Sequence, residues 1–445
     1  MTAGRRPTTR STAGWRALVG SRAGRIELRR RLGGYVWPAV AYLARAYRRT
    51  LGRRPRIVAI VGSAGKTTTM RAVSAVLGQP VSRRALLNMN SHTSIGRSLL
   101  GIRPWQRHAV LETAINGPGQ MGTMATTVNP QVVVVTSIGR DHWRSFGTLE
   151  QTRAEKVEIV RRLPRSGVAI LNADDPNVRW MATQTRARVV LVGEAADAAV
   201  RASDITLDWP TGMRFNVHVD GRAWPVVSRL LGRQMVYPAL AAIAVGHVEG
   251  VPIERALAAI AELHATPGRM HQTVLASGAV IVRDEFKGTI DAWESALAAF
   301  ATFPARRRIA VLGDIEEVTG KDAYRDLGRR AGAFVDRAIV VGTSTNAQLF
   351  RSGLAAAGLA RERVSHVHTA RQATELLRDE LGAGDAVLLK GRWQQALGRV
   401  ALSLAGRDVQ CRADPCPFKR MLCDLCPMLE RPFEGLPGAA VELEP

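Results

Sequence analysis

A glycine-rich stretch beginning at Gly62 carries the residue types that bind phosphate. It reads G-S-A-G-K-T-T and lies between an apolar segment, 56–61, and a segment, 66–77, with apolar residues at helical spacing. Glycines let backbone N–H groups approach phosphate oxygens, and a helix N-terminus favours negative charge. Lys66 can reach the terminal phosphates of a nucleotide, and Thr67 can ligate Mg²⁺. We predict a nucleotide site here, with an ordinary glycine turn as the alternative; its residues are Gly62, Ser63, Ala64, Gly65, Lys66, Thr67 and Thr68.

A second group with chemical potential lies at the other end of the chain. All four cysteines, Cys411, Cys416, Cys423 and Cys426, fall within sixteen residues. Four thiolates can hold Zn²⁺ or an iron–sulfur cluster, and the C-x2-C pair at the end has the spacing typical of such sites. We predict a metal site there, most readily zinc, with reduced or redox-active thiols as the alternative.

The elements that must position these residues alternate between strands and helices. Short apolar runs at 56–62, 108–112, 131–137 and 167–172 predict buried strands, and helical patterns lie between them. An alternating stretch at 205–227 predicts a hairpin region, and 239–263 is helical. A second α/β series starts at 279 and continues with strands at 308–312, 337–342 and 385–389. Such alternation favours mostly parallel sheets covered on both faces.

The predicted fold class is therefore α/β, with a phosphate-loop domain followed by a Rossmann-like domain. We place a basic N-terminal extension at 1–55, the central domain at 56–265, the C-terminal domain at 266–405 and a cysteine-rich tail at 406–445.

Positive charge is concentrated at the N-terminus. The chain has a formal charge of +24, and residues 1–56, with fifteen arginines and one acid, contribute +14 of it. Such a leader can contact an anionic membrane, and residues 33–49 could form an interfacial segment. The longest apolar run there, 35–44, is about half of what a spanning helix needs. A solvated extension is the alternative. Nucleic acid is not an expected partner, because no helix-turn-helix or aromatic-interleaved pattern accompanies the arginines.

The motifs resemble, in order, those of the Mur ligases. Residues 61–69, V-G-S-A-G-K-T-T-T, are similar to the phosphate loop of that family, which is more specific than a generic one. The match continues through Glu112 and the segments 117–122, 129–142, 146–150, 154–159 and 171–176, and then through 267–269, Asp284, 310–314 and 389–391. Among the branches, the one that adds D-alanyl-D-alanine to a UDP-linked muramoyl tripeptide is most similar, although its N-terminal UDP-binding domain has no counterpart here.

The resemblance implies an ATP-dependent, ADP-forming ligase that makes an amide bond through an acyl phosphate. It implies a cytoplasmic enzyme of cell-wall peptidoglycan or envelope polymer synthesis, with a location at the inner face of the membrane as a further expectation. Formation of the acyl phosphate and its attack by the amine both bring negative charges together. Catalysis therefore depends mainly on positioning the reactants and neutralising that charge. The resemblance implies that Lys66, Lys156 and His142 are catalytic. It also implies that Thr67 and Glu112 hold Mg²⁺, and that His142 and a carbamylated Lys156 hold a second metal. Arg269 and Asp284 would contact ATP.

Each of these residues has a less specific interpretation. Glu112 could be a surface acid, His142 a loop histidine and Lys156 a solvated lysine. The sequence also departs from the family where adenine is held, since residues 232–238 read G-R-Q-M-V-Y-P, with Gln234 in place of a histidine. A nucleotide-binding regulatory or scaffold protein derived from a Mur ligase is therefore the alternative function.

The substrates should differ from the usual ones as well. Only about 55 basic residues precede the first strand, too few for a folded UDP-binding domain. We therefore expect carboxylate and amine substrates of which the acid is lipid-linked, polymeric or small.

Overall fold

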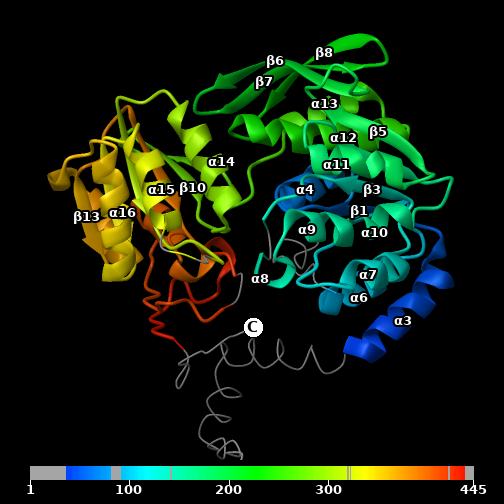
Figure 1. The fold of residues 1–445 in the computed structure, drawn as a ribbon, viewed down its shortest axis with the longest axis horizontal. Helices are drawn as coiled ribbons and strands as arrows, with labels where there is room; N and C mark the ends of the chain where they lie inside the picture. Colours follow the sequence, from blue (N-terminus) through cyan, green and yellow to red (C-terminus); the bar gives the residue numbers. More distant parts are fainter. Residues whose placement is uncertain are drawn as a thin grey trace, which may run out of the picture.

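The computed structural model describes residues 37–81, 92–140, 143–317, 320, 322–418 and 421–435. These residues form two sheets that lie side by side, each with helices on both faces (Figure 1). The predicted α/β class with mostly parallel sheets is confirmed. None of the helices in the described part of the chain is long and apolar enough to cross a membrane.

The first sheet has eight strands in the order β2-β1-β3-β4-β5-β6-β7-β8. The strands from β2 to β6 in this order pair in parallel, and β6, β7 and β8 form an antiparallel meander. Their bounds are β1 (Arg56–Val61), β2 (His108–Glu112), β3 (Val132–Val135), β4 (Val168–Asn172), β5 (Arg188–Gly193), β6 (Val200–Asp208), β7 (Gly212–Val219) and β8 (Arg222–Ser228). The carboxyl ends of β1, β2 and β3 therefore meet at one edge of the sheet.

Side chains of β1 alternate between two cores, which explains its unbroken apolar sequence. Val58 and Ile60 pack into the core under α4 (Lys66–Val76), α12 (Val236–Val248) and α13 (Ile253–Ala261). Ile57, Ala59 and Val61 pack into the opposite core. The helices on that side are α3 (Trp37–Arg49), α6 (His92–Leu100), α7 (Gln120–Val128), α9 (Leu149–Lys156), α10 (Glu158–Arg161) and α11 (Pro176–Trp180). A strand buried on both faces needs apolar residues at every position.

The second sheet has six strands in the order β13-β12-β11-β14-β10-β9, all parallel except the edge strand β9. Their bounds are β9 (His271–Val274), β10 (Val280–Asp284), β11 (Arg307–Leu312), β12 (Arg337–Val341), β13 (Val364–Val367) and β14 (Asp385–Lys390). Helices α14 (Ile290–Ala301), α15 (Asp322–Gly332) and α16 (Ser344–Ala356) cover one face, and α17 (Ala370–Leu377) and α18 (Gly398–Leu404) cover the other.

Short elements connect these layers. They are α8 (Trp143–Phe146), η1 (Leu51–Arg53), η2 (Met181–Gln184), η3 (Arg233–Met235), η4 (Arg361–Arg363), η5 (Trp393–Gln395) and η6 (Cys423–Leu425). The predicted helix 239–263 is interrupted at the turn before Ile253, and the helical pattern between β3 and β4 divides at Val157 into α9 and α10. The sheets fall within the predicted ranges 56–265 and 266–405, while the domain boundaries themselves stay a prediction.

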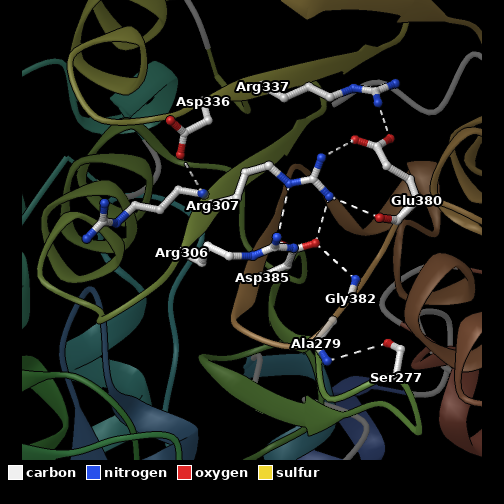
Figure 2. A network of polar contacts seen from close by, with 10 residues as sticks. Ser277, Ala279, Arg306, Arg307, Asp336, Arg337, Glu380, Gly382 and Asp385 are labelled. Atoms are coloured by element: carbon white, nitrogen blue, oxygen red, sulfur yellow. Dashed lines mark hydrogen bonds and ion pairs between the residues drawn. The ribbon is translucent and has the colours of Figure 1, made fainter.

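An ion-pair network joins the amino ends of three neighbouring strands of the second sheet (Figure 2). Asp385, at the start of β14, is fully buried, and its carboxylate accepts hydrogen bonds from Arg307 at 2.7 Å and Arg306 at 3.2 Å. Glu380 extends the network to Arg307 and Arg337. Burial pushes the pKa of Asp385 up, but the hydrogen bonds and charge of Arg307 outweigh it and leave that pKa lowered.

We expect Asp385→Asn to lower the free energy of unfolding by about 3 kcal/mol, because it removes one partner of a buried ion pair. Since the folded pKa of Asp385 is lowered, its contribution is full at neutral pH and is lost as the pH falls through the folded value. The difference between wild type and variant in urea unfolding should therefore shrink below about pH 4. Asp326→Asn, which removes an exposed helical ion pair, is the control with little effect. A difference that stays constant down to strong acid would contradict this role.

Candidate active site

The phosphate loop is held against the end of β3 by close backbone packing. Gly62 has a φ of +145°, and a Cβ on it would lie 2.0 Å from the Thr136 hydroxyl oxygen. Gly65 has a φ of +77° and caps the N-terminus of α4. Both positions favour glycine, the first because of space as well as conformation. The loop therefore presents the start of α4 to the same sheet edge at which β2 and β3 end.

Thr67 and Glu112 meet at this edge, as predicted for the Mg²⁺ ligands. Glu112 ends β2 opposite Ile60 of β1, and Thr67 is the second residue of α4. The Thr67 hydroxyl donates to a Glu112 carboxylate oxygen at 2.7 Å, and both side chains are buried. This burial excludes the interpretation of Glu112 as a surface acid. A hydroxyl and a carboxylate in contact beside a phosphate loop are oxygen donors that fit Mg²⁺.

Two buried lysines converge on the same loop. The Lys66 ammonium donates to the carbonyl oxygens of Gly62 at 2.7 Å and Ser63 at 3.2 Å. The Lys156 ammonium, from the last residue of α9, donates to the Ser63 hydroxyl at 2.7 Å. Lys156 is only 3% exposed, which excludes the solvated-lysine interpretation. The structure thus brings Lys66 and Lys156 together at Ser63, while Thr67 and Glu112 meet at the start of the same helix, α4.

A third lysine reaches the loop from the other half of the molecule. Lys287, just after β10, donates to the Ser63 carbonyl oxygen at 2.8 Å. Arg140 makes a second link across the halves, with ion pairs to Asp291 at 2.7 Å and Glu294 at 3.0 Å. Lys287 is not among the residues predicted from the sequence. The available signal was its place three residues after Asp284, which resembles a residue of the family.

A cavity of 290 Å³ lies where the two halves meet. Its walls come from the phosphate loop and start of α4, from residues 234–238, from 268–270 and 284–287, and from α14. Gln234, Arg269 and Asp284 all line it. The Arg269 guanidinium lies 4.9 Å from the centroid of the Phe286 ring. The cavity combines a phosphate loop, cations and apolar walls, which suits a nucleotide.

Asp284 is held firmly inside this cavity. Its carboxylate accepts from the Lys390 ammonium at 2.6 Å and from the Met270 backbone N–H at 3.0 Å. Burial raises the pKa of Asp284, and the charge of Lys390 opposes that rise. Lys390, the last residue of β14, also donates to the carbonyl oxygens of Asp284 and Lys287. Lys390 therefore orders the whole turn that carries both Asp284 and Lys287.

His142, the remaining predicted ligand, lies outside the described residues, as does Asp141.

Within the residues that the structure describes, nothing marks the four cysteines as the predicted metal centre. They gather around the buried Arg399 guanidinium, which interacts electrostatically with Cys411, Cys416 and Cys423. Burial raises the pKa of the Cys423 thiol to about 12 and also raises the pKa values of Cys416 and Cys426. Over the described ranges, no group of three or more His, Cys, Asp or Glu side chains is arranged to hold a metal ion. The structure therefore gives zinc or an iron–sulfur cluster no support.

The tail is nonetheless packed onto the second sheet. Arg283 of β10, almost fully buried, donates to Glu285 at 2.8 Å and to Asp424 of the tail at 2.8 and 2.9 Å. The Cys416 N–H donates to the Gln394 carbonyl oxygen at 2.7 Å. A small apolar cluster of Ala396, Cys416, Phe418 and Met428 lies beside it.

Comparisons with known proteins agree with this geometry. Residues 60–246 match the Mur ligase middle domain, and residues 268–393 match the Mur ligase, glutamate ligase domain. The UDP-N-acetylmuramoyl-tripeptide–D-alanyl-D-alanine ligase of Mycobacterium tuberculosis (strain CDC 1551 / Oshkosh) is 32% identical over 378 residues, which are 79% of this chain and 73% of that protein. The enzyme of the same name from Escherichia coli (strain K12) is 28% identical over 305 residues, 67% of each chain.

Solved structures show the same fold. A crystal structure of MurF from Acinetobacter baumannii matches with a TM-score of 0.72 at 22% identity, covering 83% of this chain and 80% of that one. MurF ligase from Thermotoga maritima in complex with ADP matches with a TM-score of 0.69 at 22% identity, covering 83% of both chains.

Proposed function

Because the chain belongs to the Mur ligase family, we propose that it joins a peptide-bearing carboxylate to the amine of an amino acid or dipeptide in envelope polymer synthesis. Members of the family are ATP-dependent, ADP-forming ligases that use Mg²⁺, and this chain is such an enzyme. Nothing supports the alternative of a regulatory or scaffold protein. The observation that carries the proposal is the convergence of buried Lys66, Thr67, Glu112 and Lys156 on the phosphate loop.

The proposed reaction has two steps. First, a carboxylate oxygen forms a bond to the γ-phosphorus of ATP while the bond to the β-phosphate oxygen breaks, and ADP leaves. Second, the amine nitrogen bonds to the carbonyl carbon, phosphate leaves, and the nitrogen loses its proton. Neither step proceeds unless anionic groups are held together, so the site must supply positive charge and fixed geometry.

Roles for the residues follow from their positions. Lys66 would release the loop carbonyls and bind the terminal phosphates of ATP, and Lys287 would add a second ammonium from the opposite wall. Thr67 and Glu112 would hold Mg²⁺, which neutralises phosphate charge when bound. Arg269 would contact phosphate, and Asp284 would contact ribose from its place in the cavity. We propose His142 and a carbamylated Lys156 as ligands of a second metal.

The substrates define the test. The Mycobacterium and Escherichia relatives are named for a UDP-linked tripeptide and D-alanyl-D-alanine, and this pair is the first arm of an assay of ADP release. Lipid-linked and polymeric peptide acids are the second arm, and we propose that they are the better substrates. Faster ADP release in the first arm would reverse that preference. ADP release that matches in wild type, Lys66→Ala and Lys156→Ala would remove the ligase assignment of this site.

We also propose that the enzyme works in the cytoplasm at the inner face of the membrane. Residues 1–56 carry +14 of charge, which would attract the anionic lipids of that leaflet. Such a location would bring the active site near lipid-linked acids.

Zinc or an iron–sulfur cluster at the four cysteines remains a prediction that rests on their spacing. Metal analysis of the purified chain tests it: about one zinc per chain, lost in Cys423→Ser/Cys426→Ser, is the expected result. Four free thiols by thiol titration, with no bound metal, would show that Arg399 is their only partner cation.

A further inference from the structure

Helix α3 buries an arginine and exposes large apolar side chains, unlike an ordinary surface helix. Its buried positions are Ala44 and Arg48, while Tyr42, at 72% exposed, and Leu43 point outward. The Arg48 guanidinium is satisfied internally, because it donates to the carbonyl oxygens of Gly52, Arg53, Val128 and Asn129. A surface helix normally buries its apolar stripe and exposes its charges. The outward stripe of α3 is thus apolar without any partner in the described chain.

Other exposed apolar side chains lie at the same corner. Of the eight large hydrophobic side chains exposed in the described residues, five come from α3, η1, the end of α6 and the α6–β2 connection: Tyr42, Leu43, Leu51, Leu100 and Trp105. Helix α3 packs against α6 (Figure 1), and the Tyr47 hydroxyl donates to the Ile102 carbonyl oxygen, which fixes the connection beside the helix. We name these five residues the α3 corner. A concentration of exposed apolar groups marks an interaction site.

The surroundings of the α3 corner are strongly basic. Residues 37–56 and 92–107 contain no acidic residue, and the exposed arginines among them are Arg49, Arg53, Arg54, Arg103 and Arg107. A hollow of 340 Å³ beside the helix is lined by Arg45, Arg48, Arg49 and Arg162, of which Arg162 pairs with Glu158 at 3.2 Å. Arginine guanidinium groups bind phosphate through paired N–H donors. The corner therefore offers apolar side chains next to a phosphate-binding hollow.

We propose that the α3 corner docks on an anionic lipid bilayer. Tyr42, Leu43 and Trp105 enter the interfacial layer, and exposed arginines such as Arg49 and Arg53 contact lipid phosphates. Aromatic and leucine side chains beside arginines are the combination that membrane interfaces select. Charge complementarity favours this occupant, because α3 belongs to the N-terminal segment 1–56, whose net charge is +14. The proposal deepens the membrane part of the proposed function, and it holds whatever the substrates are.

The test is flotation of the full chain, without ATP, with phosphatidylcholine vesicles that contain none or about a third of phosphatidylglycerol. Wild type should float with the anionic vesicles and stay behind with the neutral ones. Tyr42→Ser/Leu43→Ser should reduce the bound fraction about tenfold or more, and Arg49→Glu should reduce it by a similar factor. The matched controls replace exposed residues elsewhere: Val274→Ser/Leu376→Ser and Arg361→Glu should bind like wild type.

Folding of the variants is checked by circular dichroism. Three results would overturn the docking surface. If Tyr42→Ser/Leu43→Ser floats like wild type and salt abolishes all binding, the arginines act by charge alone, and only the general membrane proposal survives. If light scattering shows a dimer that this variant converts to a monomer, the corner is an interface between copies. If wild type binds RNA but not anionic vesicles, the partner is nucleic acid.

Discussion

Lys66→Ala is expected to lower the rate of ADP formation about a thousandfold, the largest loss of any single substitution in the site. Lys66 is the first residue of α4, and its ammonium donates to the Gly62 and Ser63 carbonyl oxygens of the loop at which we propose that the terminal phosphates bind. A preorganised cation at that position stabilises charge that develops during phosphoryl transfer, which alanine cannot do. The rate should therefore fall far more than the affinity for ATP.

The measurement is steady-state ADP release at saturating ATP, with nucleotide affinity measured separately by equilibrium binding. Arg222→Ala, which removes an exposed cation on β8, is the control that should keep full activity. Lys287→Ala should fall between the two, because its ammonium contacts the same loop at Ser63 from the other half of the molecule. Equal rates for Lys66→Ala and Arg222→Ala would show that phosphoryl transfer does not occur at this loop.

Lys156→Ala is expected to lower the same rate roughly a hundredfold or more. Its ammonium is buried against the Ser63 hydroxyl, one residue from the glycine that packs on β3. Whether it acts as an amine or as a carbamate, it lies against the loop at which we propose that phosphoryl transfer occurs. The alanine variant loses the contact of Lys156 with the Ser63 hydroxyl at a buried position.

Carbamylation of Lys156 can be measured directly by NMR. After incubation with ¹³C-bicarbonate, wild type should show one carbamate carbon signal by NMR that Lys156→Ala lacks. Arg161→Ala, near the end of the same helical stretch but exposed, should retain both the signal and the activity. A wild-type rate loss on removal of dissolved CO₂, absent in Lys156→Ala, would support the carbamate further. A carbamate signal that persists in Lys156→Ala would place the modification elsewhere.

The sequence could predict the part of the site that is encoded locally. The phosphate loop, Thr67 and Lys66 lie in one segment, so strand–turn–helix patterning is enough to position them. Glu112 and Lys156 could be added only through the resemblance of their segments to those of the family, since one ends a strand and the other ends helix α9. The two sheets could likewise be predicted, since their central strands are continuous apolar runs. Edge strands β9 and β13 carry polar residues such as Gln272 and His366 and give no such signal.

Contacts between distant segments could not be predicted. Lys287 approaches Ser63 across 224 positions of sequence, and Arg140 approaches Asp291 across 151. Their pairing depends on how the two halves pack, which local patterns do not encode. The burial of Arg48 in helix α3 could not be predicted either. The arginine content of this helix predicts an exposed, solvated surface, whereas Arg48 is buried and donates to backbone carbonyl oxygens.

The cysteine tail has a feature that its spacing does not predict. The C-x2-C pair of Cys423 and Cys426 predicts thiolate ligands, and burial raises the pKa of the Cys423 thiol to about 12. The buried Arg399 guanidinium interacts electrostatically with Cys411, Cys416 and Cys423. Nothing in the linear spacing identifies Arg399, which belongs to helix α18 of the preceding half.

Successive side chains of strand β10 face opposite sides of the sheet. This alternation links the nucleotide cavity on one side to the C-terminal tail on the other. Asp284 faces the cavity, while its neighbour Arg283 faces the tail and pairs with Asp424. A polypeptide cut at residue 393, where the family match ends, would leave Arg283 buried with half of its counter-charge. The counter-charge of a buried arginine beside the cavity therefore comes partly from the tail, beyond the residues that match the family.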